Sequence, residues 1–191
     1  MADQKGATEL AGYRTHLTAE AVRAMLDYDP ETGIFLWRHR ADRPKKWNAR
    51  YAGTPAGYVS NGYRIIQVDG RGSYQSARLA WLLVYGVWPT HQVDHINGAR
   101  NDNRIANLRE ANNGENNRNR GPQANNKLGL RGVSKWGARW QARIMIDGVQ
   151  RRIGAFATPE EAAAAYQGAA AVVHGEFFDP ARGVSSYKRS R

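Results

Sequence analysis

The chain has 191 residues, of which 41% are apolar, so it can bury one modest core or two small ones. Its formal net charge of +11 favours a polyanionic partner, and nucleic acid is the first candidate. The absence of cysteine excludes disulfides, thiolate zinc sites and thiol nucleophiles. No stretch approaches the roughly 20 apolar residues that span a bilayer, so we expect a cytoplasmic protein without membrane contact.

The first elements are a short helix and a strand. Residues 1–15 are small and polar, and we expect a disordered tail there. Thr18 is suited to cap a helix that carries Val22, Met25 and Leu26 on one side and stops at the turn formers of residues 29–33. Residues 34–37 indicate a strand, and residues 38–51, which mix charges with a tryptophan, indicate a loop.

A hairpin and a longer helix follow. Asn61-Gly62 is the dipeptide of tight hairpins and separates two apolar runs, at residues 58–59 and 63–68. Asp69-Gly70 predicts another turn. Residues 76–85 have helical apolar spacing and end at Gly86, so this helix is expected to anchor the first core.

The second half predicts a sheet with one helix. Residues 121–129 are rich in turn formers and predict a linker at a domain boundary. Strands are expected at residues 132–136, 139–146 and 149–156, with Asp147-Gly148 as the hairpin turn. Thr158, Pro159 and Glu161 form a helix start, and the alanine-rich run from there to His174 is expected to end at Gly175.

This sheet is expected to have one basic face. Between residues 118 and 152 there are nine basic residues and one acid. The turn pairs Arg143 with Arg152, and like charges directly opposite one another are destabilising unless a counter-charge such as a DNA backbone lies between them. A solvated charged face is the alternative. The basic face would carry Arg139, Gln141, Arg143, Gln150 and Arg152, and the apolar face, which includes Val149, would pack on the helix through Ala163, Tyr166 and Val173.

Residues 93–119 hold the candidate active site. Asp94 and His95 would point to opposite faces of a strand unless the strand ends there, and the Asn97-Gly98 turn permits that ending. A carboxylate and an imidazole are suited to bind a metal and to activate water for phosphodiester hydrolysis. Glu115 lies in the capping-box position of a following helix, although asparagine-rich segments also form ordinary surface turns.

The segment VDHINGARNDNRIANLREANNGENNRN resembles the metal-binding motif of the HNH homing endonucleases of bacteriophages. The resemblance extends upstream to residues 26–33 and 78–81. It implies a ββα-metal (His-Me finger) nuclease module over residues 16–120, which would act in the host cell cytoplasm if the protein is phage-encoded. By this resemblance, His95 would be the general base, and Asp94 and Asn116 would bind one divalent ion, Mg²⁺ or Mn²⁺. Asn107 would brace the loop that orients His95. Asn117 and Asn119 are rival ligands, and Asn103 is a second candidate for bracing the loop.

The segment that begins RGVSKWGARWQARIMIDG at Arg131 resembles the Apetala-two or ethylene-response-factor DNA-binding domain. That resemblance implies a three-stranded antiparallel sheet packed on one α-helix over residues 130–180, followed by a basic tail at residues 181–191. The sheet would lie in the major groove of DNA. The DNA-binding residues carried over by motif position are Arg131, Trp136, Arg139, Arg143 and Arg152. Ser134 and Met145 replace arginines that the family often has, so its target sequence does not transfer.

Together these patterns predict an α+β chain with a nuclease module and a DNA reader. The expected function is a homing-type HNH endonuclease that acts on double-stranded DNA as a monomer or weak dimer. Nicking and double-strand cutting both stay open. The alternative is a non-catalytic, sequence-specific DNA-binding regulator. RNA binding is a third possibility, but the sequence shows no aromatic platform for single strands.

Overall fold

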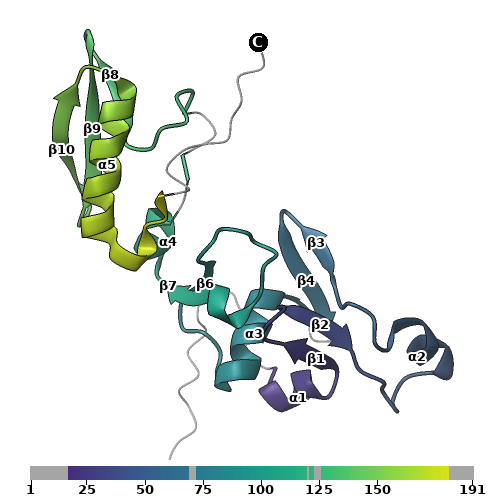
Figure 1. Ribbon diagram of the computed structural model, residues 1–191. Coiled ribbons are helices and arrows are strands. Elements are labelled where there is room, and N and C mark those ends of the chain that lie inside the picture. Colours follow the sequence, from purple (N-terminus) through teal and green to yellow (C-terminus); the bar gives the residue numbers. More distant parts are fainter. Residues whose placement is uncertain (1–16, 69–71, 120, 123–125, 181–191) are drawn as a thin grey trace, which may run out of the picture. The chain divides into compact units, whose positions relative to one another are not determined.

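A computed structural model describes residues 17–68, 72–119, 121–122 and 126–180 (Figure 1). Contacts divide the chain into two units, Met1–Ala111 and Asn112–Arg191. The division follows Ala111, so the linker expected at residues 121–129 lies inside the second unit. The expected tails at residues 1–15 and 181–191 and the Asp69-Gly70 turn lie outside the described residues.

The first unit begins with α1, Ala19–Arg23, whose cap is Thr18 as predicted. The helix is shorter than expected, because Leu26 opens strand β1, Leu26–Asp29, which pairs antiparallel with β2, Ile34–Trp37. The helical spacing of Met25 and Leu26 is therefore overridden by hairpin pairing. Gly33 ends the connecting turn with a φ of +72°, a conformation that favours glycine.

A three-stranded sheet follows, with order β3-β4-β5. Its strands are β3, Tyr58–Ser60, β4, Tyr63–Val68, and β5, Gly72–Gln75, and the β3–β4 turn at Asn61-Gly62 confirms the predicted hairpin. Between β2 and β3, where a loop was expected, the chain forms helix α2, Lys45–Tyr51. Helix α3, Ser76–Tyr85, ends at Gly86 as predicted.

The first unit closes with a two-stranded hairpin. Strand β6, Gln92–His95, pairs antiparallel with β7, Leu108–Ala111, and a short 3₁₀ turn, η1 (Ile105–Asn107), precedes β7. Leu108 is buried in the core that α3 shares with α1, β1, β2 and β4. The β6–β7 hairpin is thereby anchored to the main core of its unit. Within the described residues, no helix combines the length and apolar composition that a membrane crossing requires.

The second unit contains α4, Asn113–Arg118, which has the predicted capping box of Asn112 and Glu115. Strands β8, Val133–Trp136, β9, Arg139–Ile146, and β10, Val149–Phe156, form an antiparallel sheet of order β10-β9-β8. The register places Arg143 opposite Arg152 as predicted. Helix α5, Pro159–His174, and the 3₁₀ turn η2, Gly175–Phe177, complete the unit.

The structure corrects two expectations about side chains on this sheet and its helix. Helix α5 buries Ala163 and Tyr166, but Val173 is 38% exposed, because His174 takes the position in line with Tyr166 and Ala170. Val149, expected on the apolar face, is 54% exposed at the hairpin end. Gln141 shares a face with Arg143 as expected, since its amide hydrogen-bonds Ser134 and Arg143, and it is only 6% exposed. The whole is a mixed α+β protein with several small sheets.

Candidate functional site

Asp94 and His95 are the last two residues of β6, and both are buried, with exposed fractions of 7% and 4%. The strand ends at His95, as predicted, because the chain turns there: the Gly98 N–H donates to the His95 carbonyl at 2.8 Å. Gly98 has a φ of +71°, which suits glycine at this turn. A strand end thus holds a buried carboxylate and a buried imidazole side by side in sequence.

The carboxylate of Asp94 pairs with Arg109, its cross-strand partner on β7. Arg109 Nη2 and Nε lie 3.0 and 3.2 Å from Asp94 Oδ2, and the two side chains are only 12% and 9% exposed. A pair so well shielded from water is a strong interaction, and a metal ion would have to share this carboxylate with Arg109. Sequence reasoning missed Arg109, because the pairing depends on the register between β6 and β7.

The imidazole of His95 contacts Asn103, whose Oδ1 lies 3.3 Å from His95 Nε2. Asn103 is 2% exposed, and its Nδ2 donates to the Asn101 carbonyl at 3.2 Å. Asn107, expected to brace the loop, accepts from the Asn97 N–H at 2.9 Å and donates to the Asp102 carbonyl at 2.8 Å. The loop therefore uses two buried asparagines, one tying its ends and one facing the imidazole.

An ion pair stabilises the same loop. Asp102 accepts hydrogen bonds from Arg104 Nε at 2.8 Å and from Asn97 Nδ2 at 2.7 Å. The Arg104 guanidinium, with help from Asn97, lowers the pKa of Asp102 to about 2. The carboxylate stays ionised across the ordinary pH range, so this part of the loop does not change charge there.

Strand β1 and the β1–β2 turn contact the loop between β6 and β7. Tyr28 Oη donates to the Asn103 carbonyl at 2.7 Å, and the Ile105 N–H donates to the Pro30 carbonyl at 3.0 Å. A Cβ on Gly33 would lie 2.4 Å from Arg104 N, closer than real Cβ atoms come to backbone. The turn at residues 30–33 thus packs its backbone directly on the loop that carries Asn103.

Tyr63 and Arg100 are two further residues of this region that were not identified from the sequence. The ring centroid of Tyr63, at the start of β4, is 6.1 Å from that of His95. Arg100 Cζ lies 5.0 Å from the centroid of the Tyr63 ring, and its Nη1 donates to the Asn61 carbonyl at 3.2 Å. The β3–β4 hairpin therefore holds Tyr63 near the imidazole, and Arg100 packs on the ring of Tyr63.

The expected ligand Asn116 lies on α4 in the second unit and is half-buried. Asn117 is exposed and Asn119 is 2% exposed. Because Asp94 belongs to the first unit, its meeting with Asn116 stays a prediction. Within the part of the chain that the structure describes, no three His, Asp or Glu side chains gather as a metal site.

Four of the expected DNA-binding residues lie on the sheet. Arg152 Cζ lies 4.3 Å from the centroid of the Trp136 ring, and Arg139 Nη2 donates to the Ala155 carbonyl at 2.9 Å. Arg143 donates to Gln141 Oε1 at 2.9 Å. The opposed Arg143 and Arg152 thus have separate partners within the protein, which weakens the argument that their repulsion requires DNA.

Arg131 is placed differently from the other four. Its Nη1 donates to the Arg118 carbonyl at 2.6 Å, and its Nη2 donates to the Asn117 carbonyl at 2.9 Å. These carbonyls belong to the last turn of α4, where helix carbonyls lack intrahelical partners. The donors that we expected to face DNA are used to cap α4.

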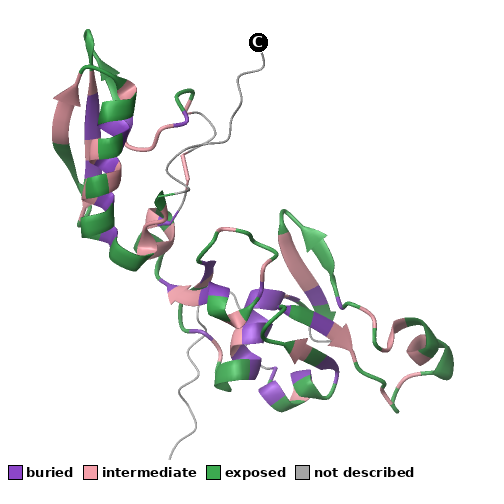
Figure 2. Ribbon diagram, in the orientation of Figure 1, coloured by how far each residue is buried: buried purple, intermediate pink, exposed green. Residues whose placement is uncertain are grey.

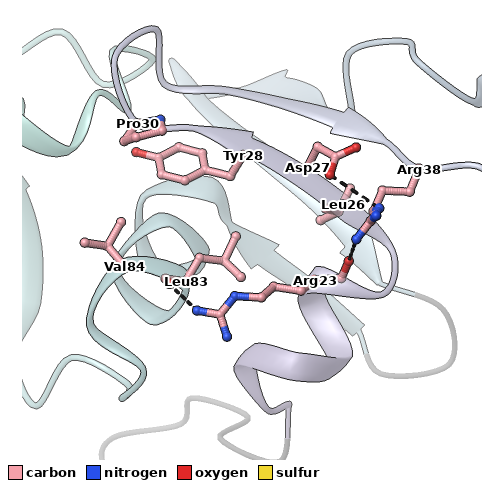
Figure 3. Close-up of a pocket in the computed structure, with 8 residues that line it drawn as sticks. All are labelled: Arg23, Leu26, Asp27, Tyr28, Pro30, Arg38, Leu83 and Val84. Atoms are coloured by element: carbon pink, nitrogen blue, oxygen red, sulfur yellow. Dashed lines mark hydrogen bonds and ion pairs between the residues drawn. The ribbon is translucent and has the colours of Figure 1, made fainter.

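A separate hollow of about 360 Å³ lies between α1, β1 and α3 (Figure 3). Its arginines are used to join these elements: Arg23 donates to the Leu83 carbonyl at 2.6 Å, and Arg38 Nε lies 3.3 Å from Asp27 Oδ1. Neither Asp94 nor His95 lines it. The buried end of β6 is therefore the stronger candidate for a chemical site.

The family model described as HNH endonuclease matches residues 75–118, from the end of β5 to the end of α4. The match includes Asp94, His95, Asn107 and Asn116. No match was found among curated proteins or among solved structures. Residues 75–118 therefore carry an HNH endonuclease domain.

Proposed function

We propose that this protein is a homing-type, metal-dependent DNA endonuclease that hydrolyses phosphodiester bonds in duplex DNA, with His95 as the general base. One observation carries the proposal: within the HNH domain, the imidazole of His95 is buried at a strand end and its ring is oriented by a buried amide. A general base needs such orientation because proton transfer depends on geometry before it depends on pKa.

The hydrogen bonds around Asn103 indicate which nitrogen of His95 is the base. Asn103 Nδ2 donates to the Asn101 carbonyl, so Oδ1 is the atom that faces the imidazole. An amide oxygen only accepts, and therefore Nε2 carries the proton of the neutral ring. The lone pair is left on Nδ1, which would take a proton from the attacking water. Asn103 is a positioning residue in this scheme.

A divalent ion fits the donors that the chain offers. Carboxylate and amide oxygens, such as those of Asp94 and Asn116, suit Mg²⁺ or Mn²⁺, and cysteine is absent. When bound, one such ion would stabilise charge on the phosphate and on the departing oxygen. Arg109 would remain beside Asp94 and hold its carboxylate in one orientation.

Arg100 would add a fixed positive charge to the same site. Its guanidinium is held over Tyr63 and bonded to Asn61, so it needs little ordering when a phosphate arrives. Preorganised cations near a developing negative charge lower activation barriers. We assign Arg100 the role of a phosphate contact next to Tyr63.

DNA recognition is assigned to the sheet of the second unit, in the manner of the Apetala-two family. Arg139, Arg143 and Arg152 would contact phosphates or base edges, with Trp136 supporting Arg152. Arg131 is assigned to holding α4 instead. With one site per chain, a monomer would nick one strand, and a double-strand break would need a dimer or two successive cuts.

The competing proposal is a non-catalytic DNA-binding regulator, favoured by the Asp94–Arg109 ion pair, which already occupies the carboxylate. Incubating supercoiled plasmid with the full-length protein, with and without Mg²⁺, separates the two. A nuclease converts plasmid to nicked or linear forms only with the divalent ion. Intact plasmid at every Mg²⁺ and Mn²⁺ concentration, together with a shift of duplex DNA in a gel, would favour the regulator.

A further inference from the structure

Residues 38–51, here called the basic loop, form an excursion from the first unit. The Trp37 N–H donates to the Thr54 carbonyl at 3.0 Å, and the Gly53 N–H donates to the Trp37 carbonyl at 2.7 Å. The loop therefore leaves and returns at one point on β2. Its helix, α2, has no buried residue, and Figure 2 shows it only in the colours of exposed and intermediate residues. Helix α2 therefore contributes no buried residue to the core of its unit.

The basic loop is strongly cationic. It contains six Lys or Arg residues and a single acid, Asp42. Asp42 pairs with Arg40, and Arg38 pairs with Asp27 of β1 (Figure 3). For Lys45, Lys46 and Arg50 no carboxylate partner is found among the described residues, and the first turn of α2 holds no acid. Like charges in one short segment repel, which costs stability unless a polyanion is present.

An aromatic cluster fixes the shape of this charged surface. Trp47 packs against Trp37 and Tyr51, with ring centroids 5.8 and 5.2 Å apart. The guanidinium carbons of Arg40 and Arg43 lie 5.8 and 5.6 Å from the centroid of the Trp47 ring. Cation–π contacts of this kind restrict the arginines, so less conformational entropy is lost when an anion binds.

Asn48 fixes the backbone beneath the same cluster. Its Oδ1 accepts from the Arg40 N–H at 2.8 Å, and its Nδ2 donates to the Arg40 carbonyl at 2.7 Å. These two hydrogen bonds join α2 to the part of the loop that follows β2. The backbone that carries these cations is therefore fixed by hydrogen bonds.

We propose that the basic loop is a second DNA-binding surface, which contacts the phosphate backbone without reading sequence. The inference rests on the proposed function, because the HNH domain, most of which lies in the same unit, supplies the reason to expect DNA. Exposed lysines and stacked guanidinium groups match the charge of a duplex backbone, and contacts to phosphates carry no sequence information directly.

The test measures the salt dependence of binding by the full-length protein to a short duplex. The variant Lys45→Gln/Lys46→Gln is compared with Lys45→Arg/Lys46→Arg, which changes the same two side chains and keeps their charge. If both lysines contact phosphates, the slope of log Kd against log salt falls by about 1.8 in the loop variant, since each lost contact removes about 0.9. The control pair keeps the parent slope.

An unchanged slope in the loop variant, or an equal fall in the control pair, would overturn the inference. The cutting activity of the parent is measured on the same duplex, so the two proposals can fail separately. A parent that binds without cutting removes the nuclease proposal and leaves the slope comparison valid. If the parent cuts and the slope of the loop variant is unchanged, only the proposal that the basic loop contacts DNA is removed.

Discussion

Two neighbours shape the chemistry of His95, the amide of Asn103 and the ring of Tyr63. Asn103 belongs to an irregular loop, and its place depends on bonds from Tyr28 and to Asn101. The orientation of the imidazole thus depends on side chains that are far apart in sequence. Such supporting residues commonly affect rate more than substrate affinity.

Asn103→Ala is expected to lower the single-turnover cleavage rate by about 10- to 100-fold while the Kd for DNA changes little, because the imidazole loses its orienting acceptor. Asn101→Ala is the matched control, since Asn101 contributes its backbone carbonyl and its side chain is exposed. Equal rates for the two variants would remove Asn103 from the mechanism.

Arg109→Met is expected to destabilise the protein by about 3–5 kcal/mol, because the buried carboxylate of Asp94 loses its cationic partner. If Asp94 binds a divalent ion, adding Mg²⁺ should raise the melting temperature of this variant more than that of the parent. The double variant Asp94→Asn/Arg109→Met should recover stability and lose the response to Mg²⁺. An Mg²⁺ response that persists in the double variant would place the ion elsewhere.

At the scale of elements, α4 is short and is held at both ends. The capping box of Asn112 and Glu115 satisfies its first N–H groups, and Arg131 satisfies its last carbonyls. A helix of this length is not stable by itself in water. Its order, and the position of Asn116 on it, therefore depend on Arg131.

Arg131→Lys is expected to cost about 1–3 kcal/mol of local stability, because a single ammonium cannot reproduce the two forked hydrogen bonds. Hydrogen exchange at the α4 amides measures this effect directly. Faster exchange confined to α4, with the sheet unaffected, is the predicted pattern. A variant that binds DNA more weakly but leaves α4 exchange unchanged would return Arg131 to the DNA-contacting set.

The C-terminal end of α5 should make the second unit sensitive to pH. Burial, with the positive charges of Arg118 and Arg131, lowers the pKa of His174 below its ordinary value of 6.5. The unfolded chain therefore takes up this proton first, so the stability is fully present above about pH 6.5 and is lost as pH falls toward the folded-state pKa. Hydrogen exchange at the α5 amides should show this loss, and His174→Leu should abolish it. The same pH dependence in both proteins would contradict the assignment.

The elements that the sequence predicted well carry local signals. Asn61-Gly62 and Asp147-Gly148 set two hairpins, and the capping boxes begun by Asn112 and Thr158 set two helix starts. Strand β1 and helix α2 were missed, because hairpin pairing and aromatic packing override local propensity there. The contacts Asp94–Arg109 and His95–Asn103 depend on register and on an irregular loop, and neither follows from residue spacing.

At the scale of the whole molecule, the net charge of +11 is concentrated in the basic loop and on the sheet of the second unit. Both surfaces are proposed to contact phosphates, and affinity then falls steeply with salt. Binding and cleavage must therefore be compared at one fixed ionic strength. Under that condition, the contribution of His95 to cutting is separated from the contribution of charge to binding.

The most direct test of the nuclease proposal is the single-turnover cleavage rate of His95→Ala on duplex DNA with Mg²⁺. His91→Ala is the matched control, because His91 is exposed and lies just before β6. We predict a loss of about 10²- to 10⁴-fold for His95→Ala, as expected when a general base is removed, with unchanged DNA affinity. His91→Ala should cleave like the parent. Cleavage by His95→Ala at the parent rate would contradict the account.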